Sequence, residues 1–96
     1  MWITLKDEVE DTYTNVSGSK LRLLILDILS KGENIEVSFK GATPLSSSFY
    51  NSSFGEIIEE KGLPFFKERI KLKELNKSQF ELMTRYMSTS HSYSTI

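Results

Sequence analysis

The sequence of 96 residues predicts an α/β fold, a single small layer of three to four mostly parallel strands with about three helices. Apolar residues alternate in three short segments and recur at helical spacing in three longer ones. These segments follow one another as strand, helix, strand, helix, strand, helix, an order that favours parallel strands joined by right-handed crossovers. The length allows one core, so we expect one domain over residues 1–88 and a flexible polar tail over residues 89–96.

The N-terminal residues predict a short strand, Met1–Leu5, because apolar residues alternate there with threonine. The next residues, 6–17, are acidic and polar and lack a regular pattern. We expect a loop there, with a hairpin around Tyr13 as an option.

The first long helix has the clearest periodicity. Its apolar stripe, at i, i+3, i+4, i+7 and i+8, consists of Leu21, Leu24, Ile25, Ile28 and Leu29. Ser17 or Ser19 would cap its start, and Gly32 would end it in a left-handed conformation. Leu23 and Leu26 widen the apolar arc, which predicts that this helix packs on two sides or meets a partner.

Two further strands are predicted from alternation. Residues 34–39 place β-branched and aromatic side chains on one face, before Gly41 and Pro44 break the pattern. Residues 68–72 alternate in the same way, with basic residues pointing outward, namely Arg69, Lys71 and Lys73.

The second helix is predicted to begin at a serine cap, Ser46 or Ser47, and to stop at Gly62 and Pro64. Its shared face consists of Tyr50, Phe54, Ile57 and Ile58. Gly55 inside it would be retained if the helix backbone approached the sheet closely.

The third helix is predicted after a capping box formed by Asn76 and Gln79. Its stripe consists of Phe80, Met83 and Met87.

Composition excludes several function classes. The chain has 12 basic and 13 acidic residues and a net charge of −1, so no bulk charge favours nucleic acid or an anionic membrane. It has no cysteine, which excludes disulfides, cysteine-ligated metals and a thiol nucleophile. No signal peptide or membrane-length apolar run is seen, so we expect a cytoplasmic domain.

A family resemblance rests on residues 18–58. Gly18 and Arg22 open the first helix, a strand runs through Val37-Ser38-Phe39-Lys40-Gly41-Ala42, and Leu45-Ser46-Ser47-Ser48-Phe49 leads into a helix with Phe54-Gly55. This pattern resembles a STAS-like domain of unknown function, a relative of the sulfate-transporter and anti-sigma-factor-antagonist fold. The resemblance implies a bacterial or phage regulatory module that binds another protein, and it implies neither an enzyme nor a cofactor.

The resemblance also implies a site. In the antagonists, a histidine-kinase-like ATPase partner phosphorylates a serine at the start of a helix, and the matching position here is most nearly Ser48, with Ser47 adjacent. We therefore predict a partner-binding or phosphorylation surface that includes Ser46, Ser47, Ser48, Phe49 and Tyr50, with the adjoining loop 41–45 and, as an option, the exposed part of the first helix. Phe49 and Tyr50 lie about 100° apart on a helix, so one of them is expected to stay exposed as an interface anchor. The competing interpretation of the three serines is simple helix capping.

Other functions have weaker support. The alternative role is a stand-alone inhibitor from a mobile element, a phage or a plasmid, that blocks a host protein by occupancy. Homodimer formation stays open. Catalysis would require Ser48 with His91, the only histidine, and His91 lies in the predicted tail. Glu56 and Glu60 predict a solvated acidic face, so no metal or cofactor is expected.

The basic segment between residues 61 and 77 has two interpretations. Its lysines could contact nucleic acid, but no aromatic row accompanies them. Lysines on an exposed edge strand, which discourage pairing with other sheets, are the simpler interpretation.

Overall fold

The computed structural model describes the backbone of residues 1–94 and the side chains of residues 1–88. Its three strands are β1 (Trp2–Thr4), β2 (Ile35–Ser38) and β3 (Ile70–Lys73), and they form one sheet in the order β1-β2-β3. Both pairings are parallel. The predicted parallel α/β layer is therefore confirmed, with three strands.

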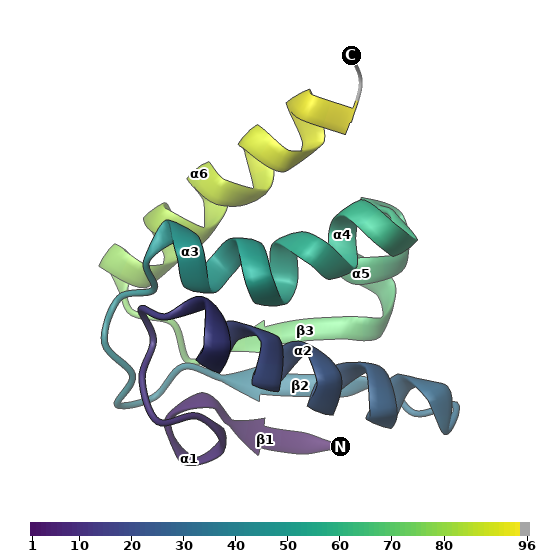
Figure 1. Ribbon diagram of the computed structural model, residues 1–96, viewed down its shortest axis with the longest axis horizontal. Coiled ribbons are helices and arrows are strands. Elements are labelled where there is room, and N and C mark those ends of the chain that lie inside the picture. The colour runs from purple at the N-terminus through teal and green to yellow at the C-terminus, as the bar shows by residue number, and fades with distance from the viewer. Residues whose placement is uncertain (95–96) are drawn as a thin grey trace.

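The helices are arranged mainly over one face of this sheet (Figure 1). They are α1 (Leu5–Glu8), α2 (Asn15–Ser30), α3 (Ser47–Tyr50), α4 (Glu56–Lys61), α5 (Leu63–Arg69) and α6 (Lys77–Ser94). A π-helical turn, η1 (Asn51–Gly55), joins α3 to α4 without a break. The three predicted helices correspond to α2, to α3–η1–α4 and to α6, whereas α1 and α5 are additional short helices.

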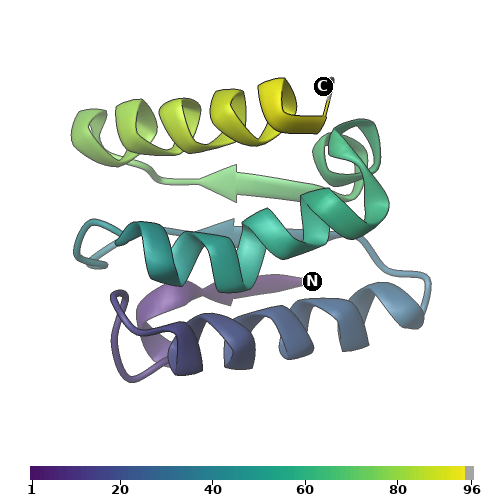
Figure 2. The ribbon, with the colours of Figure 1, turned by 45° about the horizontal axis from the view of Figure 1, so that its top comes forward.

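The core lies between the sheet and these helices. Figure 2 shows α3–η1–α4 running between α2 and α6. Inward side chains from the strands and helices are almost completely buried, among them Ile35, Val37, Leu21, Ile25, Phe54 and Ile57. The opposite face of the sheet carries Trp2, Glu36 and Lys71 in register, and all three are exposed. β3 is an edge strand, which supports the edge-protection interpretation of its lysines.

The segment 6–17 differs from the predicted loop, and no hairpin forms around Tyr13. Its first residues belong to α1, and α2 already begins at Asn15. The cap of α2 is Thr14, whose side chain accepts a hydrogen bond from the backbone N–H of Ser17 at 3.2 Å. The expectation that Ser17 or Ser19 caps this helix was wrong because the first turn, residues 15–18, contributes no residue to the apolar stripe, which begins at Leu21.

The connection into β3 also differs from the prediction. Gly62 ends α4 with φ of 92°, as expected for a glycine stop. Pro64, however, lies in the first turn of α5, where proline is well tolerated because the missing N–H has no helical partner there. This helix extends to Arg69, so the strand begins at Ile70 and not at residue 68.

The start of α6 confirms the predicted capping box. The Gln79 N–H donates to Asn76 Oδ1 at 2.8 Å, and the Asn76 N–H donates to Gln79 Oε1 at 2.9 Å. Phe80 was wrongly predicted to face inward: it is 63% exposed, whereas Met83 is buried. Gln79 takes the inward position of this turn because its amide donates to the carbonyls of Phe39 and Ala42.

The predicted tail, residues 89–96, falls largely outside the described part of the chain. The backbone of α6 continues to Ser94, so this segment begins as helix. Residues 95–96, and the side chains from residue 89 onward, His91 included, lie outside the described residues. The flexibility of the tail stays a prediction.

Candidate partner-binding surface

The carboxyl end of the parallel sheet is where α1 begins, directly after β1, and where three further helices begin. The strands all end there, and the starts of α2, α3 and α6 lie along this end of the molecule (Figure 1). In open parallel sheets, this end is where loops and helix starts form binding sites. The loop 41–45 lies here too, with Thr43 and Pro44 exposed and Leu45 buried.

Ser46 fixes the start of α3. Its hydroxyl accepts a hydrogen bond from the backbone N–H of Phe49 at 3.1 Å and donates to the Tyr13 carbonyl at 2.9 Å. Its own N–H donates to the Thr12 carbonyl at 3.0 Å. Ser46 is therefore the helix cap, one of the two residues predicted, and it also ties α3 to the segment that precedes α2.

Ser47 and Ser48 occupy the first two positions of α3, and both side chains are exposed. Since Ser46 already provides the cap, neither hydroxyl is needed for it. Neither makes a side-chain hydrogen bond within the described part of the protein. These two serines are therefore accessible at a capped helix start, where the helix dipole favours negative charge.

Phe49 and Tyr50 are both buried, with exposures of 0% and 1%, so the expectation of an exposed anchor at one of them was wrong. The reason is that α3 is covered on both sides. The Phe49 backbone lies against α2, where a Cβ placed on Gly18 would be only 2.6 Å from the Phe49 carbonyl oxygen. The Tyr50 ring stacks on Tyr86 of α6 with centroids 4.8 Å apart.

The expectation for Gly55 also changes. A Cβ there would lie 3.0 Å from the ring of Tyr50, one π-helical turn earlier, so this side chain and not the sheet requires the glycine. Ser53 stabilises the same turn by donating its hydroxyl to the Phe49 carbonyl at 2.7 Å.

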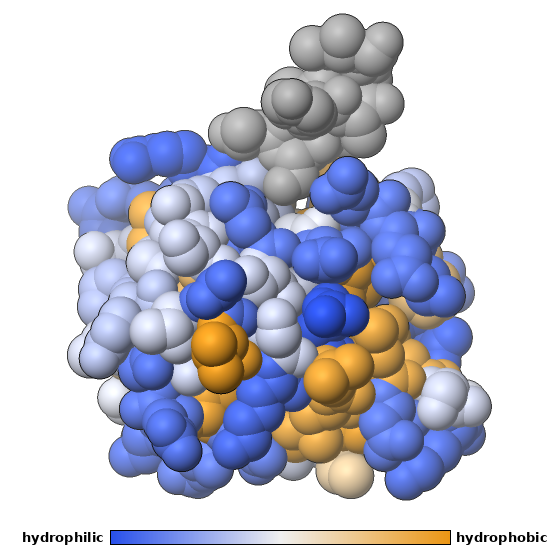
Figure 3. Space-filling model, in the orientation of Figure 1, coloured by the Kyte–Doolittle hydropathy of each residue, from blue (hydrophilic) through white to orange (hydrophobic). Residues whose placement is uncertain are grey.

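Two apolar residues at the start of α2, which the sequence pattern did not single out as site residues, are exposed. Tyr13 is 66% exposed, and Val16, in the first turn of α2, is 76% exposed. We call the surface formed by Tyr13, Val16, Ser47 and Ser48 the α2–α3 surface. Figure 3 shows weakly polar, pale atoms over the left part of this face, where α2 and α3 begin. Val16 lies outside the buried stripe of α2, and this position predicts its exposure only when the helix is known to begin at Asn15.

Asp11 holds the backbone of Tyr13 and Thr14 through hydrogen bonds to its carboxylate. Partial desolvation raises the pKa of its carboxyl group, but hydrogen bonds from the backbone of Thr14 and Tyr13 and from the side chains of Thr14 and Ser17 outweigh it. The net result is a pKa below the ordinary value of 3.8. Asp11 Oδ1 accepts the N–H groups of Tyr13 and Thr14 at 3.0 and 2.8 Å, which holds the turn before α2.

Other candidate chemistry is not brought together among the described residues. They contain no group of three or more histidine, aspartate or glutamate side chains that could hold a metal ion. Glu56 and Glu60 are both exposed on α4, in line with a solvated acidic face. Within residues 1–94, no helix combines the length and the apolar character that crossing a membrane requires.

Comparison with known proteins identifies the family. The model of the STAS-like domain of unknown function (DUF4325) matches residues 17–80. No curated protein and no solved structure matches the chain. The match spans α2 to the start of α6, and the chain belongs to this STAS-like family.

Proposed function

We propose that this STAS-like domain is a non-catalytic regulatory module that binds another protein through the α2–α3 surface. The observation that carries the proposal is the exposure of Tyr13 and Val16, at the start of α2, at the same end of the molecule as the exposed Ser47 and Ser48. Aromatic side chains at a weakly charged surface are typical anchors of protein interfaces. Ser46 connects the two parts of this surface, because its hydroxyl accepts from the Phe49 N–H of α3 and donates to the Tyr13 carbonyl.

Phosphorylation of Ser47 or Ser48 is the proposed switch. A phosphate adds a charge of about −1.5 to −2, which the free N–H groups at the start of α3 can accommodate. The same charge beside Tyr13 would disrupt an apolar contact with a partner. A histidine-kinase-like ATPase is the partner that the family resemblance suggests for this step.

Binding is tested with the double variant Tyr13→Ser, Val16→Ser. Protein captured from a lysate of the producing cell, or a purified ATPase encoded beside this chain, is compared for the wild type and the variant. We expect the variant to lose at least about tenfold in affinity for a partner held by two apolar anchors. Trp2→Ser is the matched control, because Trp2 is an exposed aromatic residue on the opposite face of the sheet. Equal binding by the wild type and both variants would remove the α2–α3 surface from the proposal.

The switch is tested with Ser48→Glu against Ser78→Glu. Ser78 is exposed and occupies the second position of α6, as Ser48 does in α3, so both variants add a carboxylate to the same place in a helix start. We expect Ser48→Glu to weaken partner binding and Ser78→Glu to leave it unchanged. Mass spectrometry after incubation with the ATPase and ATP should detect phosphate on Ser47 or Ser48. Binding without phosphate, and without any effect of Ser48→Glu, would support simple occupancy, the inhibitor alternative.

A further inference from the structure

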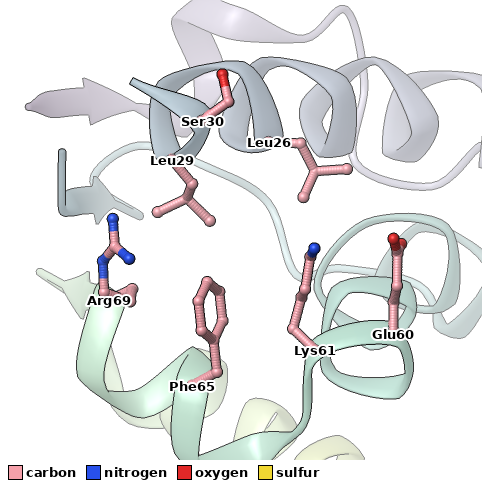
Figure 4. Close-up of a pocket in the computed structure, with 7 residues that line it drawn as sticks. All are labelled: Leu26, Leu29, Ser30, Glu60, Lys61, Phe65 and Arg69. Carbon is pink, nitrogen blue, oxygen red and sulfur yellow. The ribbon is translucent and has the colours of Figure 1, made fainter. Parts of the chain in front are cut away.

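A second surface lies at the other end of the helical layer, between α2 and the α4–α5 connection. It is a half-open groove of about 340 Å³, lined by Leu26, Leu29, Ser30, Glu60, Lys61, Phe65 and Arg69. Figure 4 shows Leu26 and Leu29 pointing from α2 toward Phe65 and Lys61, which point back from the opposite wall. The centre of the groove is therefore apolar and its rim is charged.

An exposed apolar side chain stands next to this groove. Leu23 lies on α2, one helical turn before Leu26, and it is 61% exposed. Figure 3 shows a broad apolar area at the lower right of this face, along the C-terminal half of α2. Leu23 and Leu26 are the two residues that widen the apolar arc of this helix beyond its buried stripe. The buried stripe packs against the core, whereas Leu23 lies outside it and contributes little to the core.

The charges around this area have both signs. Lys61 and Arg69 lie on the rim together with Glu60. On α2, Asp27 follows Leu23 by one turn and pairs with Lys31 at 3.3 Å, where both side chains remain more than 60% exposed. Arg69 donates to neutral acceptors, the carbonyl of Glu33 and the side chain of Asn34, so its charge is not neutralised there. A partner that carries charge of a single sign would meet like charge on this surface, whereas a second copy brings charges of both signs to it.

We propose that this groove is a dimer contact and that its occupant is Leu23 of a second copy of the chain. In an antiparallel pair of α2 helices around a two-fold axis, the Leu23 side chain of each copy would enter the groove of the other. Leu23 and Leu29 are six residues apart, about 9 Å along the helix, so one axis near Leu26 serves both contacts. Leu23 and one wall of the groove are thus on the same helix, so both halves of the contact belong to one surface, as a two-fold interface requires.

The first test is the mass of the full chain in solution, measured by sedimentation from about 5 to 500 µM, the range in which a small interface dissociates. We expect the wild type to approach twice its chain mass of 11.0 kDa with rising concentration. Leu23→Glu should raise the dissociation constant at least about tenfold, because it removes both apolar insertions of the dimer. The control Val16→Glu places the same charge on the same helix and should leave the mass unchanged. A monomeric wild type, or an equal effect of the two variants, would overturn the proposal.

The second test fills the groove with a bulky side chain. Ser30 lines the groove and is exposed, so Ser30→Trp should block insertion without disturbing the core, and it should also give a monomer. Mixing the two monomeric variants is decisive. The Ser30→Trp chain keeps its Leu23, and the Leu23→Glu chain keeps an open groove, so the mixture should recover a heterodimer through one of the two contacts. Circular dichroism should show that each variant remains folded. No recovery in the mixture would exclude reciprocal insertion.

This dimer contact is independent of the α2–α3 surface. Tyr13 and Val16 lie at the start of α2, and the groove lies beside its C-terminal half. A variant that abolishes dimerisation and keeps partner binding, or the reverse, separates the two proposals.

Discussion

The two flanks of helix α2 carry similar apolar residues but differ in burial. The inner flank, which includes Leu21 and Ile25, is completely buried against the sheet and η1. The outer flank exposes Val16 and Leu23, at 76% and 61%. Hydrophobicity alone does not separate these residues, because all four are aliphatic. Their position around the helix decides which ones stabilise the fold and which ones are available to another molecule.

The inner flank is defined by a close approach of two helices. Gly18 lies where α2 crosses the α3–η1 segment, and Arg22 donates from Nε to the Ser52 carbonyl at 3.3 Å within the π-helical turn. A π-helical turn leaves backbone carbonyls without regular partners, and here side chains supply them. Changes on this flank should therefore act on stability, and changes on the outer flank should act on association.

The largest effect is expected for Phe49→Ala. Phe49 is fully buried, so truncation removes an aromatic ring and leaves a cavity, at a cost of about 3–5 kcal/mol in the free energy of unfolding. Urea denaturation monitored by circular dichroism measures this loss. The control Tyr13→Ala, at an exposed aromatic residue, should stay within about 0.5 kcal/mol of the wild type. Similar losses for both variants would contradict the assignment of Phe49 to the core.

A smaller loss is expected for Gly18→Ala. Alanine favours the helix by about 1 kcal/mol, but its Cβ would lie 2.6 Å from the Phe49 carbonyl oxygen and 2.9 Å from the Ser52 Cβ. Overpacking of this kind costs about 1–3 kcal/mol, so we expect net destabilisation. Lys20→Ala, at an exposed position of the same helix, is the control and should be neutral or slightly stabilising. A stabilised Gly18→Ala protein would show that the two helices can separate without cost.

The inner flank also shows how far the sequence could predict this fold. The strands, the helical stripe of α2 and the capping box of α6 follow from local patterns, and the structure confirms them. Phe49 and Tyr50 could not be placed in this way. The estimate that one of them must be exposed treats α3 as a helix with a single buried face, whereas α2 covers one side of it and α6 covers the other. That arrangement depends on contacts between segments distant in the sequence.

The candidate site was predicted less completely than the fold. The three serines and the Ser46 cap were found because capping is a local property. Tyr13 and Val16 were missed because Asp11 and Thr14 start α2 earlier than its apolar stripe suggests. The prediction of a second contact for Leu23 and Leu26 came from the width of the stripe, and the groove beside them gives it a specific location.

A third prediction concerns the pH dependence of the turn that carries Tyr13. The pKa of Asp11 is lowered in the folded state from its ordinary value of 3.8. Its carboxylate therefore stabilises the fold at pH values above 3.8, and this contribution is lost as the pH falls through the lower folded-state pKa. Asp11→Asn should therefore be less stable than the wild type at pH 7, and the difference should shrink below about pH 3. Urea denaturation at both pH values measures it. A constant difference between the two proteins would show that the carboxylate charge has no part in the turn.

The smallest effect on stability is expected on the outer flank, at Leu23. A substitution there separates an effect on association from an effect on folding stability. Leu23→Glu should change the unfolding free energy of the monomer by no more than about 0.5 kcal/mol, because the side chain is largely exposed. If the chain dimerises through Leu23, the wild-type melting temperature should rise with protein concentration, since association stabilises the folded state by mass action. Leu23→Glu should remove this concentration dependence, and Val16→Glu should retain it. Melting curves that coincide at all concentrations for the wild type would place Leu23 with Val16, as a residue available only to a different protein.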